Sequence, residues 1–249
     1  MPRWPIVALF IILLTAPALA QDGPRLSLAA VEAGKALQLS LAEMAAAKAP
    51  LEIGKPPIAE PFGRIFNTKT LLALPPATAK DVPWLAEWLS ASTTVYWQLL
   101  MYGSPPNAGP QESVAIANLK RNEDEISVAL EFMLLLLPRT VGAATAFFET
   151  LPESERNSPV RQSGLARMRG GYMQTVAGGA TYIGGAPKPE NARLIAAALR
   201  STVNDWGKLS NATQRTELLT LLADARNRNK DDKVQEDLLA VSSALAAVK

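Results

Sequence analysis

Proline divides this sequence into segments, and that division constrains the fold more than any other feature. The chain has 249 residues, of which 19 are proline, and many of these prolines gather in one stretch: Pro50, Pro56, Pro57, Pro61, Pro75, Pro76 and Pro83. Each proline lacks an amide donor and restricts the residue before it, so a long helix cannot persist there. We therefore predict an extended connector over residues 50–83, with one short helical turn near residues 70–74.

Outside this connector, apolar residues recur at helical spacing between proline or glycine breaks. The predicted helices cover residues 26–49, 81–102, 110–137, 139–151, 159–183, 189–209, 212–228 and 231–248. No segment keeps the apolar–polar alternation of a β-strand. The sequence thus predicts an all-α fold, a single multi-helix bundle of about eight helices. A short α-helical repeat array is the alternative, because the last three helices are similar in length.

The first twenty residues have the layout of a secretory signal peptide. Arg3 precedes an apolar run from Ile6 to Leu14, and small residues end the segment at Ala20. The apolar run is about half of the roughly 20 residues that a membrane span needs. We therefore expect cleavage after Ala20 and a periplasmic or secreted protein.

The domain organisation follows from these segments. Residues 1–20 form the signal peptide, residues 21–80 an N-terminal helix with a proline-rich connector, and residues 81–249 a helical domain. The apolar region 126–148 is interrupted by Glu131 and by Pro138 with Arg139. We interpret it as a buried helical hairpin, and we expect no transmembrane span after signal cleavage.

The chain contains no histidine and no cysteine, which excludes several classes of site. A Ser-His-Asp triad, a thiolate nucleophile, an iron–sulfur cluster and a zinc site built on imidazole all need one of these residues. We therefore expect no metal and no cofactor, and this composition favours a binding protein over an enzyme. The formal net charge of +2 is too small to indicate a nucleic-acid partner.

Glycine recurs every seven residues in the segment predicted as the helix 159–183. The four positions are Gly164, Gly171, Gly178 and Gly185. A seven-residue step returns to nearly the same face of a helix, so the glycines predict a strip without side chains. Close packing of a neighbouring helix is the commoner reason for such a strip, and a groove for a ligand or partner is the alternative.

The same segment carries cations without acids. No Asp or Glu lies between Arg156 and Pro189, whereas Arg161, Arg167 and Arg169 all do. Guanidinium groups suit carboxylate or phosphate partners, which makes these three arginines a candidate binding site for an anionic partner. Pairing with nearby glutamates is the alternative.

Trp84 and Trp88 lie one turn apart in the helix predicted at 81–102. This spacing fits an amphipathic helix whose aromatic stripe is buried in the core. A surface that stacks on glycans is the alternative, and it requires both side chains to be exposed.

These observations favour an exported helical binding or scaffold protein of the cell envelope. Its partner is unknown, with an envelope protein or an anionic ligand as the candidates, and the arginines as the contact surface. One alternative is a carrier of an apolar or lipid ligand in a helical cavity. Another is a carboxylate-based hydrolase acting on envelope glycans, which requires two facing carboxyl groups.

Overall fold

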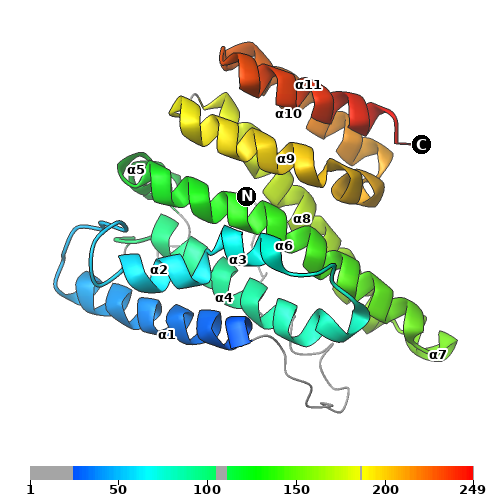
Figure 1. The fold of residues 1–249 in the computed structure, drawn as a ribbon, viewed down its shortest axis with the longest axis horizontal. Helices are drawn as coiled ribbons and strands as arrows, with labels where there is room; N and C mark the ends of the chain where they lie inside the picture. Colours follow the sequence, from blue (N-terminus) through cyan, green and yellow to red (C-terminus); the bar gives the residue numbers. More distant parts are fainter. Residues whose placement is uncertain (1–24, 105–110, 186, 249) are drawn as a thin grey trace.

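The structure, a computed structural model, describes residues 25–104, 111–185 and 187–248, and throughout these residues the regular elements are helices without a strand (Figure 1). The all-α prediction is confirmed. The predicted signal peptide lies outside the described residues. The α-helices are α1 (Arg25–Ala46), α2 (Ala59–Ile65), α3 (Thr68–Ala73), α4 (Val82–Leu100), α5 (Glu112–Arg121), α6 (Glu123–Thr150), α7 (Glu153–Arg156), α8 (Pro159–Gly184), α9 (Pro189–Leu209), α10 (Ala212–Arg228) and α11 (Asp232–Ala246).

The helices stack from α1 at one side of the molecule to α10 and α11 at the other, with α6 between them (Figure 1). Helix α1 packs against α4 and α2, so the N-terminal helix docks on its own chain. Helix α6 packs against α4 on one side and against α8 and α9 on the other. A continuous hydrophobic core, from Ala30 in α1 to Leu245 in α11, joins all these layers.

The predicted hairpin at Pro138 is wrong, because α6 continues through this proline as one helix of 28 residues. Proline inside a helix removes one hydrogen bond and costs about 3 kcal/mol. Here every residue from 132 to 138 is buried between neighbouring helices, and this packing offsets the loss. Among the described residues, α6 is the one helix long and apolar enough to cross a membrane, but most of its apolar window lies inside the bundle.

The prediction of one helix over residues 110–137 is also wrong, because Asn122 separates α5 from α6. Its side-chain oxygen accepts a hydrogen bond of 3.0 Å from the amide of Ile53, and its side-chain nitrogen donates to the carbonyl of Leu51. Asn122, Leu51 and Ile53 are all buried. Buried backbone groups need hydrogen-bond partners, and Asn122 supplies them to a loop that has no regular structure.

The proline-rich connector is more helical than predicted, since it contains α2, α3 and a 3₁₀ turn (Ala79–Asp81). Pro61 fits in α2 because it lies in the first turn, where the missing amide costs no hydrogen bond. The connector is held on the body by Trp88, whose indole nitrogen donates to the carbonyl of Ile65 at 2.9 Å. Trp88 is buried, as the core interpretation of the tryptophans expects.

The C-terminal helices form two stacked pairs, with α8 packed on α10 and α9 packed on α11. Arg193 and Arg200 of α9 form ion pairs with Asp231 and Asp237 at 2.6 Å.

Candidate functional site

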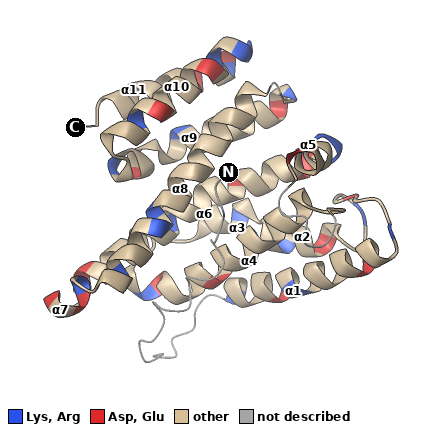
Figure 2. Ribbon diagram, turned by 180° about the vertical axis from the view of Figure 1, so that it is seen from behind, with Lys and Arg blue, Asp and Glu red and all other residues tan. Residues whose placement is uncertain are grey.

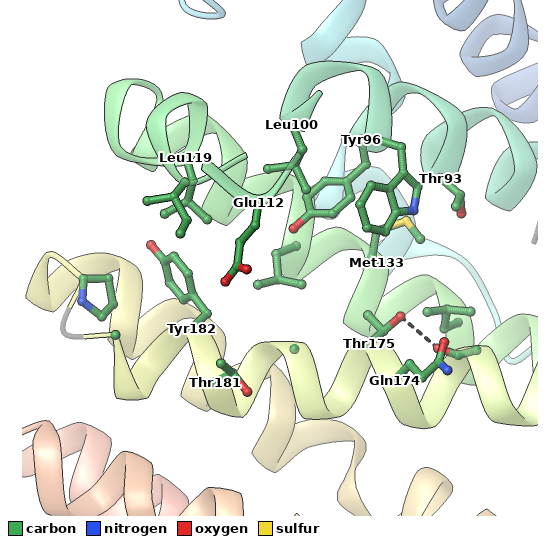
Figure 3. A pocket seen from close by; sticks show the side chains of 18 of the residues that line it. Thr93, Tyr96, Leu100, Glu112, Leu119, Met133, Gln174, Thr175, Thr181 and Tyr182 are labelled. Carbon is green, nitrogen blue, oxygen red and sulfur yellow. Dashed lines mark hydrogen bonds between the residues drawn. The ribbon is translucent and has the colours of Figure 1, made fainter. Parts of the chain in front are cut away.

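A cavity of about 740 Å³ lies between α4, α5, α6 and α8. Most of its wall is apolar, and the aliphatic and thioether side chains that line it are Leu89, Leu100, Ile116, Leu119, Leu130, Met133, Leu137 and Met168. Figure 3 shows Leu119 and Glu112 of α5 facing Tyr182 and Thr181 of α8 across this space. The volume lies within the range of about 300–1,000 Å³ that is usual for small-molecule sites.

The cavity is long, because it follows α8 over many residues. Two contacts show that α6 and α8 run antiparallel: Tyr182 donates to Glu123 at 3.4 Å, and Arg169 donates to Thr145 at 3.3 Å. The lining includes Arg167 towards one end of α8 and Tyr182 towards the other. Fifteen residues of helix separate them, or about 22 Å at 1.5 Å per residue.

Two of the predicted glycines keep the α8 wall of the cavity open. A Cβ atom added to Gly171 or Gly178 would meet no heavy atom of the described residues within 4 Å, and both glycines line the cavity. Gly185 also lines it, at the end of α8. Gly164 is buried and lies outside the lining. At Gly171 and Gly178 no described helix packs closely against α8, and both positions border the cavity.

Close packing does occur on α8, but at other glycines. A Cβ atom on Gly179 would lie 3.4 Å from Leu134 of α6 and 3.4 Å from Ile195 of α9. At Gly184 the nearest atom would be the backbone of Ala225 in α10, at 3.6 Å. Helix α8 is continuous through all these positions. It therefore has a packed face and an open face.

The three predicted arginines do not form one surface. Arg161 pairs with Glu155 of α7 at 2.7 Å, and Arg169 donates to Thr145 of α6. Arg167 lines the cavity and makes no ion pair or hydrogen bond with another residue that the structure describes. At 100° per residue, Arg167 points about 160° away from Arg169 and about 120° away from Arg161 around the helix. Arg167 alone of the three is placed to meet a ligand in the cavity.

Aromatic residues of α4 form much of the opposite wall. Tyr96 and Trp97 line the cavity, and Figure 3 shows the Tyr96 hydroxyl directed into it. That hydroxyl has no hydrogen-bond partner in the described part of the chain. Burial raises the pKa of Tyr96 to about 12, so the phenol stays neutral and can donate or accept a hydrogen bond.

Helix α5 covers the cavity and is held mainly by its C-terminal half. Asn118 is its single buried residue, and its amide donates to the carbonyls of Leu100 and Tyr102 at 3.0 and 2.8 Å. Ile116 borders the cavity with 46% of its surface exposed. A helix with so little buried surface is a low-stability element.

The end of the cavity near Tyr182 is closed by a hydrogen-bond network. Glu123 accepts hydrogen bonds from the backbone amide of Lys188 at 2.6 Å and from the side chain of Asn191 at 3.2 Å. The hydroxyls of Tyr182 and Ser127 are 2.6 Å apart. These groups are satisfied within the protein, which indicates a structural role.

The described residues offer little support for chemistry at this site. Burial raises the pKa of the Glu131 carboxyl, but Glu131 accepts a hydrogen bond from Thr68 and does not line the cavity. No group of acidic side chains in the described ranges could hold a metal ion.

Sequence reasoning found the glycines and Arg167 but missed the other walls. Neither Tyr96 nor Trp97 was predicted to line a site, and no residue of α5 was singled out. Their shared signal is weak, since aromatic and aliphatic residues at helical spacing look the same in a core and in a cavity wall.

Comparison with known proteins adds no relative: no family model, no curated protein and no solved structure matches this chain.

Proposed function

We propose that this protein binds and carries an elongated apolar ligand in the cavity between α4, α5, α6 and α8. The observation that carries the proposal is the open strip at Gly171 and Gly178. Each glycine inside a helix costs about 0.5–1 kcal/mol relative to alanine. Here no heavy atom of the described residues lies within 4 Å of a Cβ added at either glycine, so a ligand that fills this space would gain contacts.

The lining supports a slender apolar ligand. Protein interiors are close-packed, and a cavity of this size forfeits contacts that a bound molecule can restore. Leucine and methionine side chains supply most of the contact, and methionine adapts to ligands of varied shape. The polar side chains of the lining include Tyr96, Glu112, Gln174, Thr175 and Thr181, and the Tyr96 hydroxyl is directed into the cavity.

The other functions considered from the sequence have less support. A contact surface made of Arg161, Arg167 and Arg169 requires the three side chains to lie together, whereas they point to different neighbours. A hydrolase requires two facing carboxyl groups, and Glu123 is engaged by Lys188 and Asn191.

Export is part of the proposal, because residues 1–20 have the layout of a signal peptide. A carrier in an aqueous compartment shields an apolar molecule from water. N-terminal sequencing of the protein isolated from its own cells is expected to begin at Gln21. A sequence that begins at the initiator methionine would contradict export.

The carrier function is tested by blocking the cavity. Gly178→Leu places an isobutyl group in the open space, whereas Gly142→Leu makes the same change on α6 at an exposed position with no neighbouring heavy atom within 4 Å. The probe is Nile red, an uncharged dye whose fluorescence increases in apolar surroundings, displaced by hexadecanol.

We expect wild type and Gly142→Leu to bind the dye and to release it to hexadecanol. Gly178→Leu is expected to lose at least tenfold in affinity for both while remaining folded by circular dichroism. Equal binding by all three proteins, or no binding by wild type, would overturn the proposal.

A further inference from the structure

We infer that the ligand carries an anionic end group, a carboxylate or a phosphate, which Arg167 binds. The inference rests on the proposed function and adds the orientation and chemical class of the ligand: a single-chain anionic amphiphile with its head at Arg167 and its tail along the glycines.

Arg167 is placed for this role by its surroundings. It borders the cavity, it is exposed, and it has no ion pair or hydrogen bond to any side chain or backbone group that the structure describes. The cavity-lining residues of α4 and α6 at this end are Leu89, Thr93, Met133 and Leu137, none of which is acidic. A guanidinium group there is free to form two parallel hydrogen bonds with a planar or tetrahedral anion.

The charges along the cavity are asymmetric, and the asymmetry favours one orientation. Helix α8 contains Arg167 and Arg169, as well as Arg161, which is paired with Glu155 of α7, but no Asp or Glu, and Figure 2 shows its ribbon without an acidic residue. At the opposite end, the cavity is lined by Glu112 and Glu123. An anion is attracted to the first end and repelled by the carboxylates of the second.

Lys120 is the other cation that could bind the anionic head group, and it lines the cavity end that holds the two glutamates. Its positive charge is outnumbered there by the charges of Glu112 and Glu123. The field at that end therefore favours a neutral tail over an anion.

The dimensions of the cavity fit a long chain. From Arg167 the open strip passes Gly171 and Gly178 and ends near Tyr182, about 22 Å along the helix axis. A head group at Arg167 stays in contact with water, while the alkyl chain is buried between α4, α6 and α8. This division separates charge from apolar surface, which lowers the cost of desolvating the head.

The test compares three probes that share one alkyl chain: palmitate, hexadecyl phosphate and hexadecanol. Each displaces Nile red from the full chain at about neutral pH and at concentrations below self-association. We expect at least one anionic probe to bind wild type about tenfold more tightly than hexadecanol, since hydrogen bonds to charged groups are the stronger class.

Two variants remove one positive charge each from opposite ends of the same cavity. Arg167→Gln is expected to reduce the ratio of anion affinity to hexadecanol affinity to about one, with hexadecanol affinity unchanged. Lys120→Gln, the matched control, is expected to keep the preference.

The outcomes separate the two proposals. Wild type that binds hexadecanol as tightly as both anions, or a preference that survives Arg167→Gln, would overturn the head-group assignment while leaving the carrier function intact. Loss of the preference in Lys120→Gln alone would overturn the orientation. Failure of wild type to bind any probe, charged or not, would remove the carrier function and the inference with it.

Discussion

Gly178 and Gly179 are neighbours in α8, yet they face opposite kinds of surroundings. Gly179 is buried, and a methyl group there would touch Leu134 and Ile195 at 3.4 Å. Gly178 borders the cavity, where the same methyl group would touch nothing within 4 Å. One glycine allows two helices to approach, and the other leaves room for a molecule that is not part of the chain.

The comparison shows that residue type alone does not reveal why a helix contains glycine. Both residues carry the same backbone cost. On the packed face the cost is offset by contacts within the protein. On the open face no described residue supplies such contacts, and we propose that a ligand does. The following predictions test whether these two faces differ as described.

The largest effect is expected at the packed face. Gly179→Leu inserts a branched side chain between α6 and α9, where Leu134, Ile195 and Leu199 already lie at 3.4–3.6 Å. Overpacking of this kind typically lowers the free energy of unfolding by about 1–3 kcal/mol. Urea denaturation of Gly179→Leu and Gly178→Leu side by side measures it. Equal stability of the two variants would show that the faces do not differ.

A smaller effect of opposite sign is expected at the open face. Gly178→Ala adds a methyl group without a clash and removes the conformational freedom of glycine from the unfolded chain. The free energy of unfolding should rise by about 0.5–1 kcal/mol. Thermal unfolding of ligand-free protein is the measurement. A lower midpoint of thermal unfolding would mean that a methyl group at position 178 clashes with neighbouring atoms.

The smallest effect concerns an ion pair that holds the packed side together. The hydrogen bond from Arg193 lowers the pKa of the Asp231 carboxyl below its ordinary value of 3.8. Because the folded pKa is the lower one, the stabilisation is present above about pH 4 and is lost as the pH falls through the folded pKa.

Asp231→Asn removes this contribution while keeping a side chain that can cap α11. The variant should melt slightly below wild type at about pH 6, and the difference should be smaller at about pH 3. Thermal melts at both values measure it. A constant difference would indicate that the effect comes from the cap and not from the charge.

Much of the fold could be predicted because local signals agree with the packing. The bounds predicted for α9 and α10 match the structure, since Pro189 begins one helix and Asn211 caps the other through a reciprocal pair with Gln214. The failures arise where tertiary contacts outweigh local preference. Pro138 is tolerated inside α6 because the residues around it are buried. The helix ends at Asn122, whose side chain accepts a hydrogen bond from a loop residue 69 positions away in the sequence.

The candidate site could be predicted only in part. The spacing of Gly171 and Gly178 indicated a strip, and a strip has the same sequence whether a helix or a ligand covers it. Which of the two applies depends on where α4 and α5 lie, and those helices are brought to α8 by long-range packing. Arg167 was predicted together with Arg161 and Arg169, whose side chains contact other parts of the protein. The charge composition of a segment does not show which way each side chain points around a helix.

The hydrogen bonds of Asn118 and Asn122 make residues 25–80 a structural part of a cavity that these residues do not line. Asn122 joins the start of α6 to the loop at Leu51 and Ile53, and Asn118 joins α5 to the end of α4. The wall formed by α5 is thus positioned from the segment that precedes α2. Residues 25–80 therefore hold α5 in position. A fragment that starts at residue 81 would keep the glycine strip but lose the fixed position of α5 opposite it.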